Sequence, residues 1–149
     1  MGQFKNATSL IRLLPADPAA GVGLQTITVP AGEAWRVVSY AVNLTASAAV
    51  ANRYLMVTYR NVAGGMQLGK FLRMPITAQT AGLSWGFVGL IGMPADNTAM
   101  YYQTFRVNIP DIILPPLATI EVYVEGVQAA DQISWVNGGI LYEKFMVNA

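Results

Sequence analysis

The chain has 149 residues, of which 54% are hydrophobic and 11% are charged, and its nine basic and eight acidic side chains give a net charge of +1. An average soluble domain is about 25% charged. The chain has no cysteine and no histidine, which excludes disulfides, thiol catalysis, zinc sites that need Cys and a Ser-His-Asp relay. The near-neutral balance provides no basic stripe for nucleic acid, and we expect no nucleic-acid partner.

Residues 1–23 are predicted to form an extended arm in front of one domain at residues 24–149. The arm carries one apolar cluster at residues 10–14, and the prolines and glycines that follow it exclude a long helix. The cluster allows two interpretations: an arm that lies across a neighbouring subunit, or a strand that pairs within its own domain. No signal peptide is visible. The longest apolar stretch, residues 83–95, is too short and too interrupted to span a bilayer, so we expect a cytoplasmic product with no membrane partner.

From residue 24 onward, apolar side chains recur with a period of two, which predicts strands. The clearest is Thr119–Glu125, where Ile120, Val122 and Val124 share one face. The other predicted strands are 24–29, 35–44, 53–60, 66–74, 83–90, 98–109, 132–137 and 140–147. Turn signals separate them, including Met74-Pro75 and Asn137-Gly138-Gly139.

Eight or nine strands without a helical stretch predict an all-β fold, an antiparallel β-sandwich or a barrel. The long strands and unequal gaps favour a jelly-roll-like sandwich, and an immunoglobulin-like sandwich is the alternative. The gaps at 45–52 and 77–82 are long enough to connect two sheets.

Strict alternation along residues 35–44 gives two faces that are both largely apolar. Trp35 and Val37 would lie on one face, and Val38 and Tyr40 on the other. A strand that is apolar on both sides is covered on both sides. Together with the scarcity of charge, this predicts a surface that other copies of the chain cover.

No motif in the sequence predicts catalysis, a cofactor or a metal. Residues 64–70 match G-x-x-x-x-G-K, but Phe71 stands where a P-loop needs Ser or Thr, and a strand is predicted where a helix should follow. The acidic residues show no calcium-loop spacing, and no serine has a histidine to activate it. We therefore predict a protein that is not an enzyme.

The aromatic residues allow two interpretations. Trp35 and Trp135 lie in period-two runs, which predicts core packing. Exposed Tyr and Trp side chains could instead form a carbohydrate-binding platform, and one ring of Tyr101-Tyr102 must face away from the core.

At residues 28–37 the sequence reads Thr-Val-Pro-Ala-Gly-Glu-Ala-Trp-Arg-Val. This turn, the Ala-rich loop at 45–51 and the pair Asn52-Arg53 resemble small structural proteins of tailed bacteriophages. The resemblance covers about residues 24–60, and it is strongest to capsid decoration (cement) proteins. It implies a small β-sandwich, often trimeric, on the capsid exterior of the virion.

The resemblance therefore implies two partners: further copies of the chain, expected as a trimer, and the phage major capsid protein. The candidate contact residues are Phe4, Leu10, Ile11, Leu13, Leu14, Met93, Ile112, Ile113 and Leu114. A head-tail connector, tail or fibre-associated protein, and a carbohydrate-binding module, are the alternatives.

Overall fold

The computed structural model describes residues 9–49, 51–78, 84–92 and 104–147. Within these ranges the chain forms ten strands and no helix. The strands are β1 (Ser9–Leu13), β2 (Leu24–Thr28), β3 (Glu33–Thr45), β4 (Ala51–Arg60), β5 (Gln67–Ala78), β6 (Ser84–Ile91), β7 (Thr104–Ile109), β8 (Ile113–Leu114), β9 (Thr119–Glu125) and β10 (Gln132–Met146).

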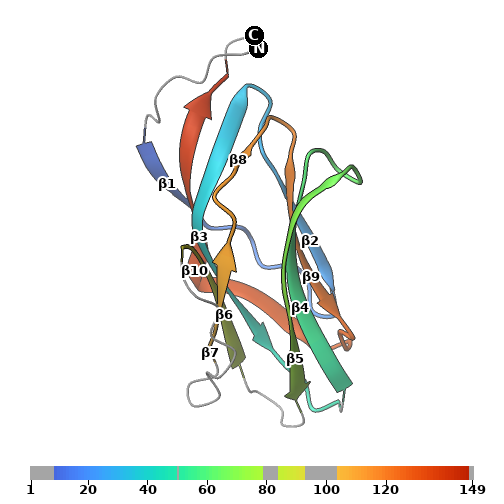
Figure 1. The fold of residues 1–149 in the computed structure, drawn as a ribbon. Coiled ribbons are helices and arrows are strands. Elements are labelled where there is room, and N and C mark those ends of the chain that lie inside the picture. The colour runs from blue at the N-terminus through green and yellow to red at the C-terminus, as the bar shows by residue number, and fades with distance from the viewer. Residues whose placement is uncertain (1–8, 50, 79–83, 93–103, 148–149) are drawn as a thin grey trace.

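The strands form two sheets that pack face to face (Figure 1). The six-stranded sheet has the order β1-β10-β3-β6-β7, and β8 also pairs with β3; the four-stranded sheet has the order β2-β9-β4-β5. The pairs are antiparallel except β6–β7, which is parallel. The predicted β-sandwich is confirmed.

The chain crosses between the sheets where the long gaps predict it. β3 lies in one sheet and β4 in the other, and β5 and β6 are divided in the same way. β3 pairs with β10 and β4 pairs with β9, so two strands near the start of the chain pair with two strands near its end. Because β4 and β5 lie side by side in one sheet, the jelly-roll order stays a prediction.

Two turn predictions are wrong, and both positions lie inside strands. Pro75 lies within β5, an edge strand, where a missing backbone N–H is tolerated. Residues 137–139 lie within β10, whose register with β3 is interrupted between Ser134 and Gly139. The two strands predicted at 132–137 and 140–147 are therefore one irregular strand. Residues 98–103 of another predicted strand lie outside the described residues.

The predicted turn between β2 and β3 is present at residues 30–32. Gly32 has a φ of +83°, a left-handed conformation that residues with a Cβ rarely adopt. The Glu33 amide donates a hydrogen bond to the Pro30 carbonyl, 3.2 Å away. Because β2 and β3 belong to different sheets, this turn carries the chain from one layer to the other.

A β-bulge at Val38 corrects the predicted faces of β3. Val37 pairs with Tyr142 and Ser39 pairs with Leu141, which leaves Val38 as an extra residue. The phase of the alternation therefore changes, and Val37 and Tyr40 both face the core. The other face of β3 carries Arg36, Ser39, Ala41, Asn43 and Thr45. Apart from Ala41 these side chains are polar, so the residue pattern of β3 no longer predicts a second chain that covers it.

The core lies between the sheets and contains both tryptophans that were predicted to pack there. Trp35 is 4% exposed and Trp135 is 1% exposed. The Trp35 ring stacks on Tyr142 with centroids 4.0 Å apart, and its Nε1 donates to Glu33 Oε2 at 2.8 Å. Such stacking adds about 0.5–1.5 kcal/mol to the burial itself.

Candidate interaction surface

The predicted contact cluster at residues 10–14 divides by strand alternation. Leu10 and Leu14 are 58% and 57% exposed. Ile11 and Leu13 point the other way and pack against the core. β1 pairs with β10 over its whole length, so this part of the predicted arm is a strand of its own domain. Two of the four side chains are therefore available to a partner.

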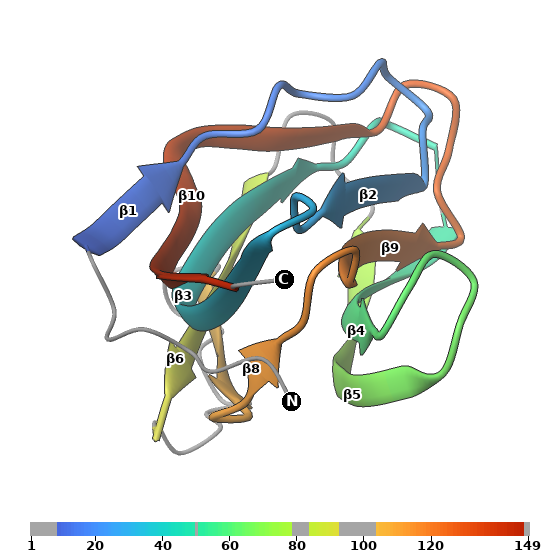
Figure 2. The same cartoon turned by 90° about the horizontal axis from the view of Figure 1, so that it is seen from above.

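The segment between β1 and β2 is held against the sandwich, as Figure 2 shows from above. Asp17 accepts hydrogen bonds from the Trp135 amide at 2.7 Å and the Ser134 hydroxyl at 3.0 Å. Gln132 Nε2 donates to the Pro18 carbonyl at 2.7 Å, and the Gly21 amide donates to the Asp131 carbonyl at 2.8 Å. Residues 9–23 therefore belong to the folded body, while Phe4 lies outside the described residues.

The second predicted contact segment, residues 112–114, contains one residue that no partner can reach. Leu114 is fully buried and pairs with Trp35 through β8, so its assignment as a contact residue is wrong. Ile112 also packs against the core, while Ile113 is 39% exposed. Sequence could not separate the three, because a two-residue strand has no period to read. Met93 lies outside the described residues.

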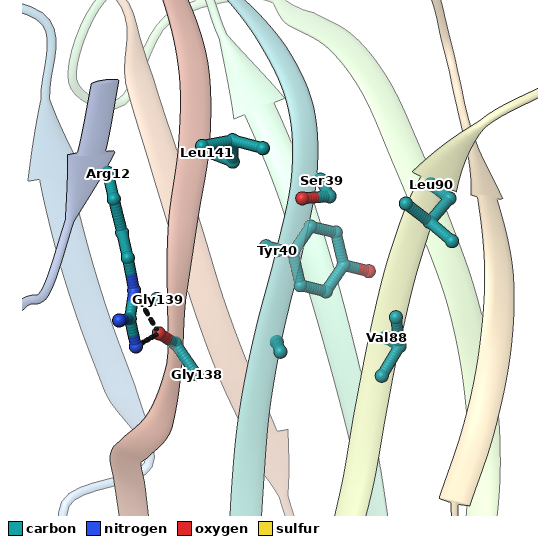
Figure 3. Close-up of a pocket in the computed structure, with 9 residues that line it drawn as sticks. Arg12, Ser39, Tyr40, Val88, Leu90, Gly138, Gly139 and Leu141 are labelled. Carbon is teal, nitrogen blue, oxygen red and sulfur yellow. Dashed lines mark hydrogen bonds between the residues drawn. The ribbon is translucent and has the colours of Figure 1, made fainter. Parts of the chain in front are cut away.

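A groove of about 380 Å³ lies on the six-stranded sheet next to β1. Figure 3 shows the side chains that line it, from β1, β10, β3 and β6. Ser39, Ala41, Gly138 and Gly139 are small, and Val88, Leu90 and Leu141 are apolar. Apart from Arg12, the lining side chains carry no charge, so the groove suits van der Waals packing rather than acid–base chemistry.

Arg12 forms one rim of this groove and is held across β10. Its Nε and Nη2 atoms donate to the Gly138 carbonyl at 3.0 and 2.5 Å (Figure 3). A Cβ at Gly138 would collide with the carbonyl oxygen of Ala41, so the close approach of β10 to β3 requires glycine there. No sequence signal marks this site, because Asn137-Gly138-Gly139 is equally typical of a turn.

A fully buried ion pair ties two loops together at one end of the sandwich. Arg53 Nε lies 2.5 Å from Asp131 Oδ2, and Nη2 lies 2.9 Å from Oδ1; both side chains are 0% exposed. Arg53 also donates to the Ala49 carbonyl at 2.9 Å. Asp131 accepts from the amides of Ser47 and Gln128, each at 2.8 Å. The ion pair therefore fixes the β3–β4 and β9–β10 loops.

The pKa of Asp131 predicts how stability changes in acid. Burial alone raises this pKa, but the hydrogen bonds from Arg53, Ser47 and Gln128 outweigh burial and lower it from 3.8 to about 2. A lowered folded pKa adds stability above the unfolded pKa, and that stability is lost as pH falls from about 4 to about 2. The difference corresponds to about 2 kcal/mol. We expect urea unfolding midpoints to fall across this window, and to fall less in Asp131→Asn.

The other described carboxylates also make contacts within the chain. Arg36 bridges Asp111, at 2.5 Å, and Glu143, at 3.0 Å, and hydrogen bonding to Arg36 lowers the pKa of Asp111. Glu121 accepts from Arg60 at 2.9 Å. Within the described part of the chain, no group of three His, Cys, Asp or Glu side chains could hold a metal ion.

All five basic side chains that the structure describes contact oxygen atoms of the same chain. They are Arg12, Arg36, Arg53, Arg60 and Lys144. The charges at described positions therefore stabilise the fold of the chain itself, and exposed apolar side chains such as Leu10, Leu14 and Met66 lie on the surface.

The described aromatic residues do not form a row on a sheet face. Trp35, Trp135, Tyr40, Tyr59 and Tyr142 are buried. Burial raises the pKa of Tyr40 and of Tyr59 well above the ordinary value. Tyr123, on β9, is the one described aromatic side chain that is substantially exposed, at 39%.

The motif at residues 64–70 forms a turn followed by the start of a strand, as predicted. Residues 67–70 begin β5, and the register with β4 shifts where Tyr59 pairs with Gly69 and Arg60 pairs with Gln67. A phosphate-binding loop opens a helix, so this segment is not one.

Within the described ranges, no helix is long and apolar enough to cross a membrane. No protein-family profile matches the chain, and no curated protein sequence matches it.

Proposed function

We propose that the chain is a non-enzymatic structural protein of a bacteriophage virion, which self-associates and decorates the capsid by bridging major capsid subunits. The observation that carries this proposal is the segment at residues 28–37. It resembles decoration proteins, and here it forms the crossover between the two sheets, with Trp35 anchored in the core. The resemblance extends the proposal to a location on the capsid exterior and to a trimeric state.

The surface chemistry supports a protein that works through contacts. The described basic side chains are engaged within the chain, and large apolar side chains are exposed at Leu10, Leu14 and Ile113. Burial of apolar surface contributes about 25 cal/mol per Å², and many repeated contacts on a lattice add up to strong attachment. Such attachment requires no catalytic group and no cofactor.

The test is to add purified protein to undecorated capsids assembled from the major capsid protein of the same genome. We expect co-sedimentation that saturates at a fixed ratio to the capsid subunits, and capsids that resist a higher temperature. No co-sedimentation at micromolar protein would contradict capsid decoration. Binding only to purified tails or connectors would favour the connector, tail or fibre alternative.

Two variants separate the predicted contacts. Deleting residues 1–8 removes Phe4 but leaves β1 and the Asp17 contacts intact, whereas deleting residues 1–23 would remove a strand of the sheet. We expect the shorter deletion to weaken capsid binding without changing the unfolding midpoint. Met66→Ala, on the turn before β5, is the matched control for loss of an exposed apolar side chain. Equal capsid binding by the wild-type protein, the variant without residues 1–8 and Met66→Ala would exclude residues 1–8 as a contact.

Tyr123 makes carbohydrate binding the second candidate, although a single exposed ring is a weak platform. Retention on a glycan array that is lost in Tyr123→Ala would support that function instead.

A further inference from the structure

β1 is a terminal strand of the six-stranded sheet, and β10 pairs with one of its two edges. Figures 1 and 2 show β1 at the outer margin of the sandwich. Among the described residues, no strand pairs with its other edge. Natural proteins protect such edges with charge, proline, bulges or covering segments, because a free edge recruits another strand.

The sequence around β1 is self-complementary about Arg12. Residues 10–14 read Leu-Ile-Arg-Leu-Leu, with apolar side chains one and two positions away on both sides. In an antiparallel pair centred on Arg12, Leu10 lies opposite Leu14 of the partner subunit. Ile11 then lies opposite Leu13 of the partner subunit. Because residues directly opposite share a face, exposed side chains meet exposed ones and core-facing side chains meet core-facing ones.

The charge that would oppose this pairing points away from the edge. Two arginines directly opposite each other are destabilising. Arg12, however, reaches across β10, and both of its bonded nitrogens donate to the Gly138 carbonyl (Figure 3). Its guanidinium therefore neither blocks the edge nor lies between two paired β1 strands.

We propose that β1 is an assembly edge, at which two copies of this chain join by antiparallel pairing of β1 about a two-fold axis at Arg12. The six-stranded sheets of the two copies then become continuous, and the contact is isologous. The edge rests on the self-association in the proposed function and not on capsid binding. In a trimer, the same edge would link one trimer to the next.

The first experiment uses the absence of native cysteine. Arg12→Cys places two thiols opposite each other, at the cross-strand Cβ separation of about 4.5–5.5 Å, which small backbone adjustment brings into disulfide range. We expect mild oxidation to convert most of this variant to a covalent dimer on a non-reducing gel. Met66→Cys is the control, because Met66 is 67% exposed and lies on the turn before β5.

A cysteine scan tests the register. Leu10→Cys alone places its two thiols about 13 Å apart along the paired strands, at ~3.3 Å per residue, which is too far for a disulfide. Combining Leu10→Cys with Leu14→Cys brings unlike positions together and restores cross-linking. Strong cross-linking of Leu10→Cys alone would overturn the Arg12-centred register.

The second experiment keeps Arg12 and adds charge to the exposed face of β1. The double variant Leu10→Lys, Leu14→Lys is expected to halve the molar mass measured by light scattering, because lysine on an edge strand opposes pairing. Met66→Lys should leave the mass unchanged. Unfolding midpoints of both variants, measured in urea, show whether the fold is intact.

A wild-type mass of one chain, 16.0 kDa, would overturn the proposal. An unchanged mass in the folded double lysine variant would do so as well, as would Arg12→Cys cross-linking no faster than Met66→Cys. If the protein fails these tests but binds capsids, only the proposal of an assembly edge is contradicted. If the β1 strands pair but the protein does not bind capsids, only the proposed capsid function is contradicted.

Discussion

Asp131→Asn is expected to lower the free energy of unfolding by about 3–5 kcal/mol. The substitution leaves Arg53 as a buried cation without its carboxylate, since both side chains are 0% exposed. For a chain of this length the loss corresponds to a melting temperature lower by roughly 10 °C. Urea unfolding followed by the fluorescence of the buried Trp35 and Trp135 measures it directly.

Asp111→Asn is the matched control for the buried pair. Asp111 also bonds to an arginine at 2.5 Å, but its side chain is 56% exposed, and water replaces the lost contact. We expect little change in its unfolding curve. An equal loss in the two variants would show that burial does not set the strength of the Arg53–Asp131 pair.

A third variant separates the value of the pair from the penalty of breaking it. Replacing both partners by apolar residues, as Arg53→Met with Asp131→Leu, leaves no unpaired charge. We expect this variant to recover much of the stability that Asp131→Asn loses. The amides of Ser47 and Gln128 would still lack their acceptor, so recovery should be incomplete.

Leu114→Ala is expected to cost about 2–5 kcal/mol, because it opens a cavity beneath β8 in a fully buried part of the core. Ile113→Ala, one residue earlier and 39% exposed, should change stability by about 0.5 kcal/mol or less. Thermal unfolding of the two variants in parallel tests the opposite orientations of neighbouring side chains in a two-residue strand.

The Ile113→Ala and Leu114→Ala variants also test whether the segment at residues 112–114 contacts a capsid subunit. If it contacts a capsid subunit, Ile113→Ala weakens binding at unchanged stability. Leu114→Ala would weaken capsid binding only because less of the protein is folded. When binding is measured well below the unfolding midpoint of this variant, that effect disappears. Similar stability losses in the two variants would contradict the placement of Leu114 inside the core and Ile113 outside it.

Period-two patterns predicted most strands because each alternates between core and solvent. Thr119–Glu125 has the predicted bounds, with Ile120, Val122 and Val124 buried. The prediction failed where alternation is interrupted. A bulge at Val38 changes the phase of β3. β10 continues as a single strand through the irregular register between Ser134 and Gly139. Neither irregularity has a local sequence signature that distinguishes it from a turn or a regular strand.

Long-range contacts were beyond sequence reasoning for a different reason. Arg53 and Asp131 are 78 residues apart, and Asp17 and Trp135 are 118 apart. No local sequence pattern indicates such contacts, because the proximity of these residues depends on how the two sheets pack. The groove shares this limit, since it combines small residues of β3 and β10 with Arg12 of β1.

By itself, the sequence determined the fold class, because the alternation of apolar and polar side chains is a property of neighbouring residues. It also determined that histidine and cysteine chemistry is absent. Only the tertiary structure decided where the scarce charges go. The described basic side chains are held within the fold, Leu114 is in the core, and the exposed leucines of β1 lie at a sheet edge. The physical reason is that burial and pairing depend on strands that are distant in the chain and meet only when the two sheets pack.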